Sequence, residues 1–83
     1  MTAQLALFAP TRLLSQCQPG DTIRLPGWRD AMTIHDITVT GTHIQVHGMW
    51  HPPGQKPPRY NDVAAGAGGF SRDDEPVHII TPR

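Results

Sequence analysis

Hydrophobic and polar residues alternate through residues 19–50 with the period of a β-sheet that buries one face. The hydrophobic positions come in pairs: Ile23 and Leu25, Met32 and Ile34, Ile37 and Val39, and Ile44 and Val46, with Trp50 continuing the last phase. This pattern predicts three consecutive strands. Ile34 and Ile37 are an odd number of residues apart, so strict alternation cannot bury both. We therefore expect a β-bulge at His35 and Asp36, which restores the phase and bends the strand.

Glycine and proline mark the ends of the predicted strands. A Pro-Gly-Asp turn at residues 19–21 starts the first strand, and the Pro-Gly pair at residues 26–27 ends it. Residues 28–30 are too few for a parallel crossover, so the second strand should return antiparallel. Gly41 follows Thr40 between two runs rich in Thr, Ile and Val, which predicts a hairpin at this point.

The chain has 83 residues, a length that indicates one small domain. We divide it into an N-terminal arm (1–18), a three-strand core (19–50), a Pro/Gly-rich loop (51–69) and a closing strand (70–83). The fold class is mainly β: a small SH3-like or open β-barrel of four to five antiparallel strands with a short N-terminal helix or turn. The alternative is a β-meander sheet packed by an N-terminal helix. The predicted core includes Trp50, Ile34, Ile37, Val46 and Ile79.

Composition narrows the classes of partner. Seven basic and seven acidic residues cancel, so no net charge draws the protein to nucleic acid or to a membrane. Cys17 is alone and cannot form an internal disulfide, which favours a reducing, cytoplasmic location, and we interpret it as a small buried residue. Residues 1–18 have no secretory signal or membrane-spanning pattern. Leu13, Leu14 and the leucines before them either cap an open end of the barrel or form an arm that makes a homodimer.

Three histidines follow one another at intervals of four: His43, His47 and His51. This spacing suits metal ligands on a helix, but the strand pattern here excludes a helix. On a strand, His43, Gln45 and His47 share the face opposite the buried residues and form a polar stripe that faces solvent or a partner. No carboxylate stands at ligand spacing, and no catalytic triad is recognisable, so we expect no metal, no cofactor and no enzymatic activity.

Two other segments have the composition of a partner-binding surface. Trp28 and Arg29 lie in the loop after the first strand, and Arg59 and Tyr60 lie in the Pro-rich loop. A large aromatic side chain beside Arg is favoured at interface hot spots, and loops commonly carry binding residues. The structural alternative is that Trp28 folds back over the barrel mouth and completes the core.

Several of these motifs resemble a known family. The order is a Gly-Asp turn, a strand, a Met-Thr strand, a hairpin glycine, a Trp and a late Phe, carried by Gly20, Asp21, Ile23, Leu25, Gly27, Met32, Thr33, Ile34, Gly41, Val46, Trp50, Phe70 and Val77. It is similar to the YodC-like uncharacterised small proteins. The resemblance covers residues 18–50 and the end of the chain, and it implies an SH3-like barrel. The chain departs from the pattern in its extended N-terminus and in the longer insert between Trp50 and Phe70.

The sequence thus predicts a non-enzymatic binding module for a protein partner, of the accessory or inhibitor type found on mobile elements. The alternative is a small barrel that binds nucleic acid, with Trp28 or Tyr60 as stacking platforms. Its phosphate contacts are then the arginines of the predicted strands and loops: Arg24, Arg29, Arg59 and Arg72. A third alternative is a metalloprotein or enzyme that uses the histidines.

Overall fold

Residues 11–81 form one antiparallel sheet in the computed structural model, which describes this part of the chain. The strands are β1 (Thr11–Leu13), β2 (Thr22–Arg24), β3 (Ala31–Thr40), β4 (His43–His51), β5 (Ala67–Asp73) and β6 (Pro76–Thr81), with one 3₁₀ turn, η1 (Leu14–Gln16). Their order across the sheet is β1-β6-β2-β3-β4-β5. Neighbouring strands are all antiparallel. The mainly β class predicted from the alternation is therefore confirmed.

The long β3–β4 hairpin follows the sequence pattern closely. Gly41 begins a two-residue turn with a φ of 61°, a left-handed conformation that suits glycine, and Thr40 pairs with His43 across it. The predicted bulge is confirmed, because the register shifts between Ile34 and Asp36. This irregularity lets β3 bend while both of its halves stay paired with β4.

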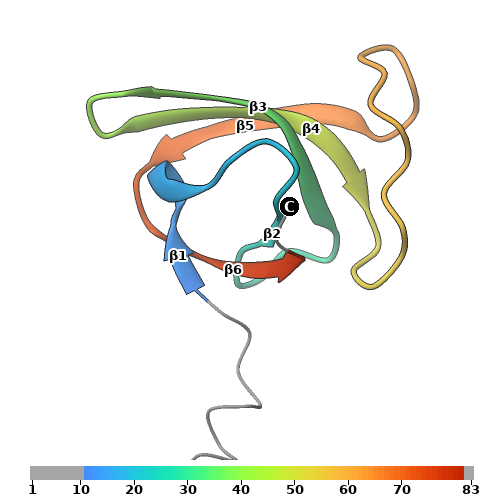
Figure 1. The fold of residues 1–83 in the computed structure, drawn as a ribbon, viewed down its shortest axis with the longest axis horizontal. Coiled ribbons are helices and arrows are strands. Elements are labelled where there is room, and N and C mark those ends of the chain that lie inside the picture. The colour runs from blue at the N-terminus through green and yellow to red at the C-terminus, as the bar shows by residue number, and fades with distance from the viewer. Residues whose placement is uncertain (1–10, 82–83) are drawn as a thin grey trace, which may run out of the picture.

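The sheet curls around a single core. In Figure 1, β3, β4 and β5 lie across the top and β1, β6 and β2 lie below them. Side chains from both halves meet between them, and the buried cluster is Leu14, Cys17, Ile23, Leu25, Met32, Ile34, Ile44, Val46, Val77 and Ile79. Trp28, Ile37, Trp50 and Phe70 are partly buried and pack against this cluster. Ile34, Val46 and Ile79 are core residues as predicted, whereas Trp50 and Ile37 lie at its margin.

Both ends of the described chain differ from the prediction. The sheet has six strands instead of four or five, because β1 pairs with β6 and because β5 and β6 replace a single closing strand. β5 begins at Ala67, inside the Gly-rich stretch expected to be loop. Residues 11–18 contain no α-helix: backbone pairing makes Thr11–Leu13 a strand, and η1 is the turn that the prediction gave as its alternative.

The N-terminal leucines have separate positions. Leu14 is fully buried and caps the core, while Leu13 is exposed. Residues 1–10, which make up most of the predicted dimer-forming arm, lie outside the described residues. Within the described residues, no helix has the length and apolar character needed to cross a membrane.

Candidate functional site

The outer face of β3, β4 and β5 is a regular array of exposed residues. Residues directly opposite each other on antiparallel strands share a face, so the register defines the rows of this array. In the order β3, β4, β5 the rows are Asp36, His47 and Gly69; Thr38, Gln45 and Ser71; and Thr40, His43 and Asp73. All nine residues are exposed. The predicted polar stripe of His43, Gln45 and His47 is therefore confirmed as the middle column of a wider surface, which we call the polar face.

The bulge extends the polar face toward the loop between β4 and β5. Ile34 is buried and Ile37 packs on the core, while His35 and Asp36 between them are both exposed. The ring of Tyr60 stacks on His35 with a centroid distance of 3.7 Å and an interplanar angle of 2°. This contact fixes the predicted binding residue Tyr60 beside the polar face.

Glycine at position 69 also shapes the polar face. A Cβ atom there would lie 2.8 Å from Cδ2 of His47 and 2.3 Å from the carbonyl oxygen of Val46. Contacts this short leave no room for a side chain, so the His47 ring lies directly over the backbone of β5. No side chain of β5 projects at this point, and the His47 imidazole covers the backbone instead.

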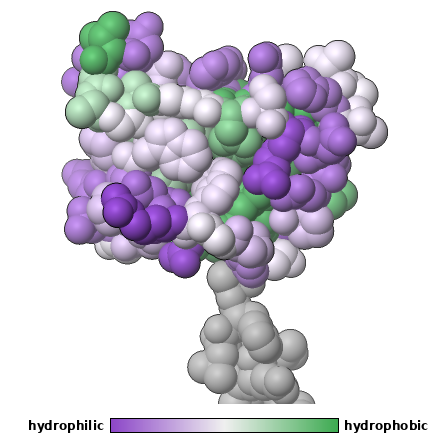
Figure 2. Space-filling view, turned by 180° about the vertical axis from the view of Figure 1, so that it is seen from behind, coloured by the Kyte–Doolittle hydropathy of each residue, from purple (hydrophilic) through white to green (hydrophobic). Residues whose placement is uncertain are grey.

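The loop of residues 52–66 adds an apolar tip next to the polar face. It projects from the body at the upper right of Figure 1, and the same projection at the upper left of Figure 2 ends in a strongly hydrophobic patch. Val63, a loop residue, is 85% exposed. Arg59 is exposed and has no ion pair among the residues that the structure describes. Sequence reasoning missed Val63, although a lone valine in a Pro/Gly-rich loop was the available signal.

Trp28 and Arg29 do not join this surface. The Trp28 ring lies edge-on to Trp50, at a centroid distance of 4.9 Å, and to Phe70, at 5.0 Å. It is half-buried against the core, as the structural alternative for this residue predicts. Arg29 beside it is exposed and lies 3.9 Å from the Asp30 carboxylate. The predicted binding residues thus fall into two groups, with Tyr60 and the β4 stripe on one side and the Trp28 segment on the other.

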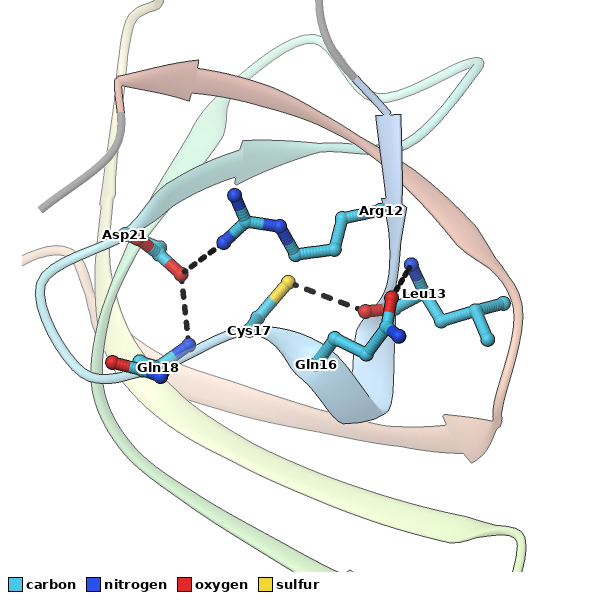
Figure 3. A network of polar contacts seen from close by, with 6 residues as sticks. All are labelled: Arg12, Leu13, Gln16, Cys17, Gln18 and Asp21. Carbon is cyan, nitrogen blue, oxygen red and sulfur yellow. Dashed lines mark hydrogen bonds and ion pairs between the residues drawn. The ribbon is translucent and has the colours of Figure 1, made fainter.

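A closed polar network occupies the end of the sheet near β1 and β2 (Figure 3). The buried Asp21 carboxylate accepts a hydrogen bond from the Gln18 N–H at 2.8 Å and lies 3.7 Å from the Arg12 guanidinium. The Cys17 thiol points at the Leu13 carbonyl oxygen, 3.7 Å away. Burial, reinforced by the Asp21 charge, raises the pKa of this thiol to about 11. Cys17 is therefore a protonated thiol at neutral pH, inside the core.

Across residues 11–81, no three His, Cys, Asp or Glu side chains gather closely enough to hold a metal ion. His43 and His47 lie two rows apart on the polar face, and His51 is buried farther along β4. The interval of four thus places two of these histidines on the polar face and the third in the interior. Comparisons of the chain with protein-family models, with curated proteins and with solved structures found no match.

Proposed function

We propose that this protein is a non-enzymatic binding module that holds a protein partner on the polar face and the adjoining loop tip. One observation carries the proposal. Nine residues in register on three strands form an open surface, and no member of this surface belongs to the buried core. Exposed loops and faces supported by a rigid sheet are the usual place for binding residues.

The chemistry of the surface suits a protein partner. Its middle row carries one amide and two hydroxyls, which donate and accept hydrogen bonds, and each outer row includes a histidine and an aspartate. Tyr60, held by its stack on His35, is a rigid aromatic group that loses little conformational entropy on binding. Val63 supplies an apolar anchor, so the surface combines a polar area with a hydrophobic contact at its margin.

For the fold, we propose that the curled sheet is an SH3-like barrel of the YodC-like type. Two contacts support this curled shape by continuing the β1–β6 pairing past Leu13 and Pro76, as far as the residue that follows β5. The Leu14 N–H donates to the Glu75 carbonyl at 2.9 Å, and the Ser15 hydroxyl donates to the Asp74 carboxylate at 2.6 Å. These bonds join η1, which follows β1, to the turn between β5 and β6.

Ion pairs and ring contacts within the chain weigh against the nucleic-acid alternative. Arg29 lies near Asp30, and Arg72 lies 3.2 Å from Glu75, so two of the four arginines assigned to phosphates have acidic neighbours. Both assigned stacking platforms already contact rings of this chain. Bases on a nucleic-acid strand would have to displace those contacts before they stacked.

A photocrosslinking amino acid at Gln45 tests the proposal, with Thr11, which lies on the edge strand β1, as the matched exposed control. In extracts of the native cell, the Gln45 variant should crosslink to one protein, the Thr11 variant should not, and excess parent protein should compete. The crosslink should survive an increase in salt from about 0.05 to 0.2 M, which weakens phosphate contacts steeply. A nuclease-sensitive product at Gln45 would instead show that the partner is a nucleic acid.

A further inference from the structure

A chain of buried hydrogen bonds links β2, β3 and β4 on the side of the sheet covered by the Pro-rich loop. The Thr22 Oγ1 lies 2.7 Å from the Thr33 Oγ1, which lies 2.7 Å from Nε2 of His51. At the other side of the ring, Nδ1 of His51 lies 3.1 Å from the Pro52 carbonyl oxygen. Thr22 and His51 are each only 5% exposed, so this chain is part of the interior.

The direction of the chain follows from its carbonyl end. A carbonyl oxygen only accepts hydrogen bonds, so His51 must carry a proton on Nδ1. In the neutral ring Nε2 then accepts from the Thr33 hydroxyl, and the Thr33 oxygen accepts in turn from the Thr22 hydroxyl. Every proton in the chain therefore points toward the Pro52 end when His51 is neutral.

Thr22 and His51, at the two ends of the chain, both border a cavity of about 310 Å³. Its other walls come from the turn before β2, from β6 and from the loop, which contributes Lys56 and its neighbours. Lys56 has no ion pair among residues 11–81, and no carboxylate lines the cavity. The cavity is therefore bordered by a free cation and two buried polar side chains, a set of groups that suits an anion.

We propose that this cavity binds a small anionic group, a carboxylate or a tetrahedral oxyanion, through the Lys56 ammonium and the Thr22 hydroxyl. An anion at Thr22 accepts a hydrogen bond, which requires the Thr22 proton to turn away from Thr33. Thr33 then donates to Thr22, and Nε2 of His51 must donate to Thr33. The bound state therefore has a proton on both ring nitrogens of His51, and anion binding takes up one proton.

Binding that takes up a proton is favoured by acid, so anion affinity should rise as the pH falls. Three charged residues lie near the hydrogen-bond chain in the cavity wall or along the strands. Lys56 borders the cavity, Asp21 precedes Thr22 on the β2 side, and Asp30 precedes Ala31, the β3 residue paired with His51. The Asp21 carboxylate is held by Gln18 and Arg12, and Asp30 lies near Arg29.

Sodium sulfate and sodium acetate are suitable probes, because neither anion changes its charge between about pH 6 and 8 while histidine does. Backbone amide NMR titrations of the whole protein should show saturable shifts centred on Thr22, His51 and Lys56. Stronger binding of sulfate would indicate a phosphoryl-type ligand, and stronger binding of acetate would indicate a carboxylate. For the preferred probe, the affinity should increase from pH 8 to pH 6, by at most about tenfold per pH unit for the uptake of one proton.

Two variants and one control decide the role of the cavity. Thr22→Val and Lys56→Ala should each weaken binding about tenfold, as expected for a lost charge-assisted hydrogen bond. Thr22→Val should also remove the pH dependence. Arg24→Ala, which removes a cation outside the cavity walls, should retain affinity within about twofold. Lys56 is an exposed loop residue, so its variant tests the site even if Thr22→Val does not fold.

The absence of saturable shifts with both anions would overturn the proposal. It would also be overturned if Arg24→Ala weakened binding as much as Lys56→Ala. The affinity would then depend on the overall charge of the protein and not on the cavity. Binding that is equally strong at pH 6 and pH 8 in the parent protein would contradict the reversal of the hydrogen-bond chain.

Discussion

The two faces of the β3–β4 hairpin belong to the same strands but have different roles. Ile44 and Val46 point inward and are fully buried, whereas Gln45 and His47, their neighbours in sequence, are exposed on the polar face. The inward residues pack against both halves of the sheet and hold the fold together. The outward residues are held in place by that packing without contributing to it. Stability and binding can therefore change independently along the same strand.

The largest expected effect is on the inner face. Ile44→Ala should lower the free energy of unfolding by about 3 kcal/mol, because it removes buried methyl groups and leaves a cavity in the core. Gln45→Ala, one residue away, should change it by less than about 0.5 kcal/mol. Urea unfolding followed by tryptophan fluorescence measures both. Equal losses in the two variants would break the distinction between the faces.

Trp28 provides an intermediate case: the sequence left it as a partner-binding residue or as a cover for the core, and in the structure it packs at the margin of the core. Trp28→Ala should cost about 1.5 kcal/mol, from lost apolar burial and two edge-on ring contacts. Arg29→Ala, which removes an exposed side chain, should cost about 0.5 kcal/mol or less. Thermal unfolding of the two variants compares them directly. A Trp28→Ala protein as stable as its parent would contradict a stabilising role for this residue and favour the binding role.

A smaller effect concerns the contact that joins η1 to the turn between β5 and β6. The hydrogen bond from the Ser15 hydroxyl, with a second from the Ser15 N–H, lowers the pKa of the Asp74 carboxyl. Ionised Asp74 therefore stabilises the fold above the unfolded-state value of about 3.9, and this contribution is lost as the pH falls through the folded-state pKa. Ser15→Ala should be less stable than the parent at pH 6, and the difference should shrink in acid. A difference that grows in acid would show that the pKa is not lowered.

Alternation and turn chemistry predicted the β3–β4 hairpin, its bulge and the exposed stripe, because each depends on residues close in sequence. β1 and β5 were not predicted, because one is very short and the other begins with Ala-Gly-Gly; both depend on pairing with distant strands. The contact of Tyr60 with His35 likewise joins segments far apart in the chain.

His51 shows that alternation predicts the side of the strand on which a residue lies, but not whether that residue is exposed. It has the phase of His43 and His47 and shares their side of β4, yet it is buried. Residues 54–57 of the Pro-rich loop border the same cavity as His51, and alternation carries no information about where such a loop lies. The same side of one strand is thus an open surface at its start and a buried hydrogen-bond chain at its end.

The most direct test of the account is the affinity of one triple variant, His43→Ala with Gln45→Ala and His47→Ala, for the partner identified by crosslinking at Gln45. All three side chains are exposed, so the variant should unfold within about 1 kcal/mol of the parent. Its binding, measured by titration calorimetry, should be at least about a hundredfold weaker, as expected when several central contacts of an interface are removed. A folded variant that binds with the parent's affinity would contradict the claim that the polar face is the docking surface.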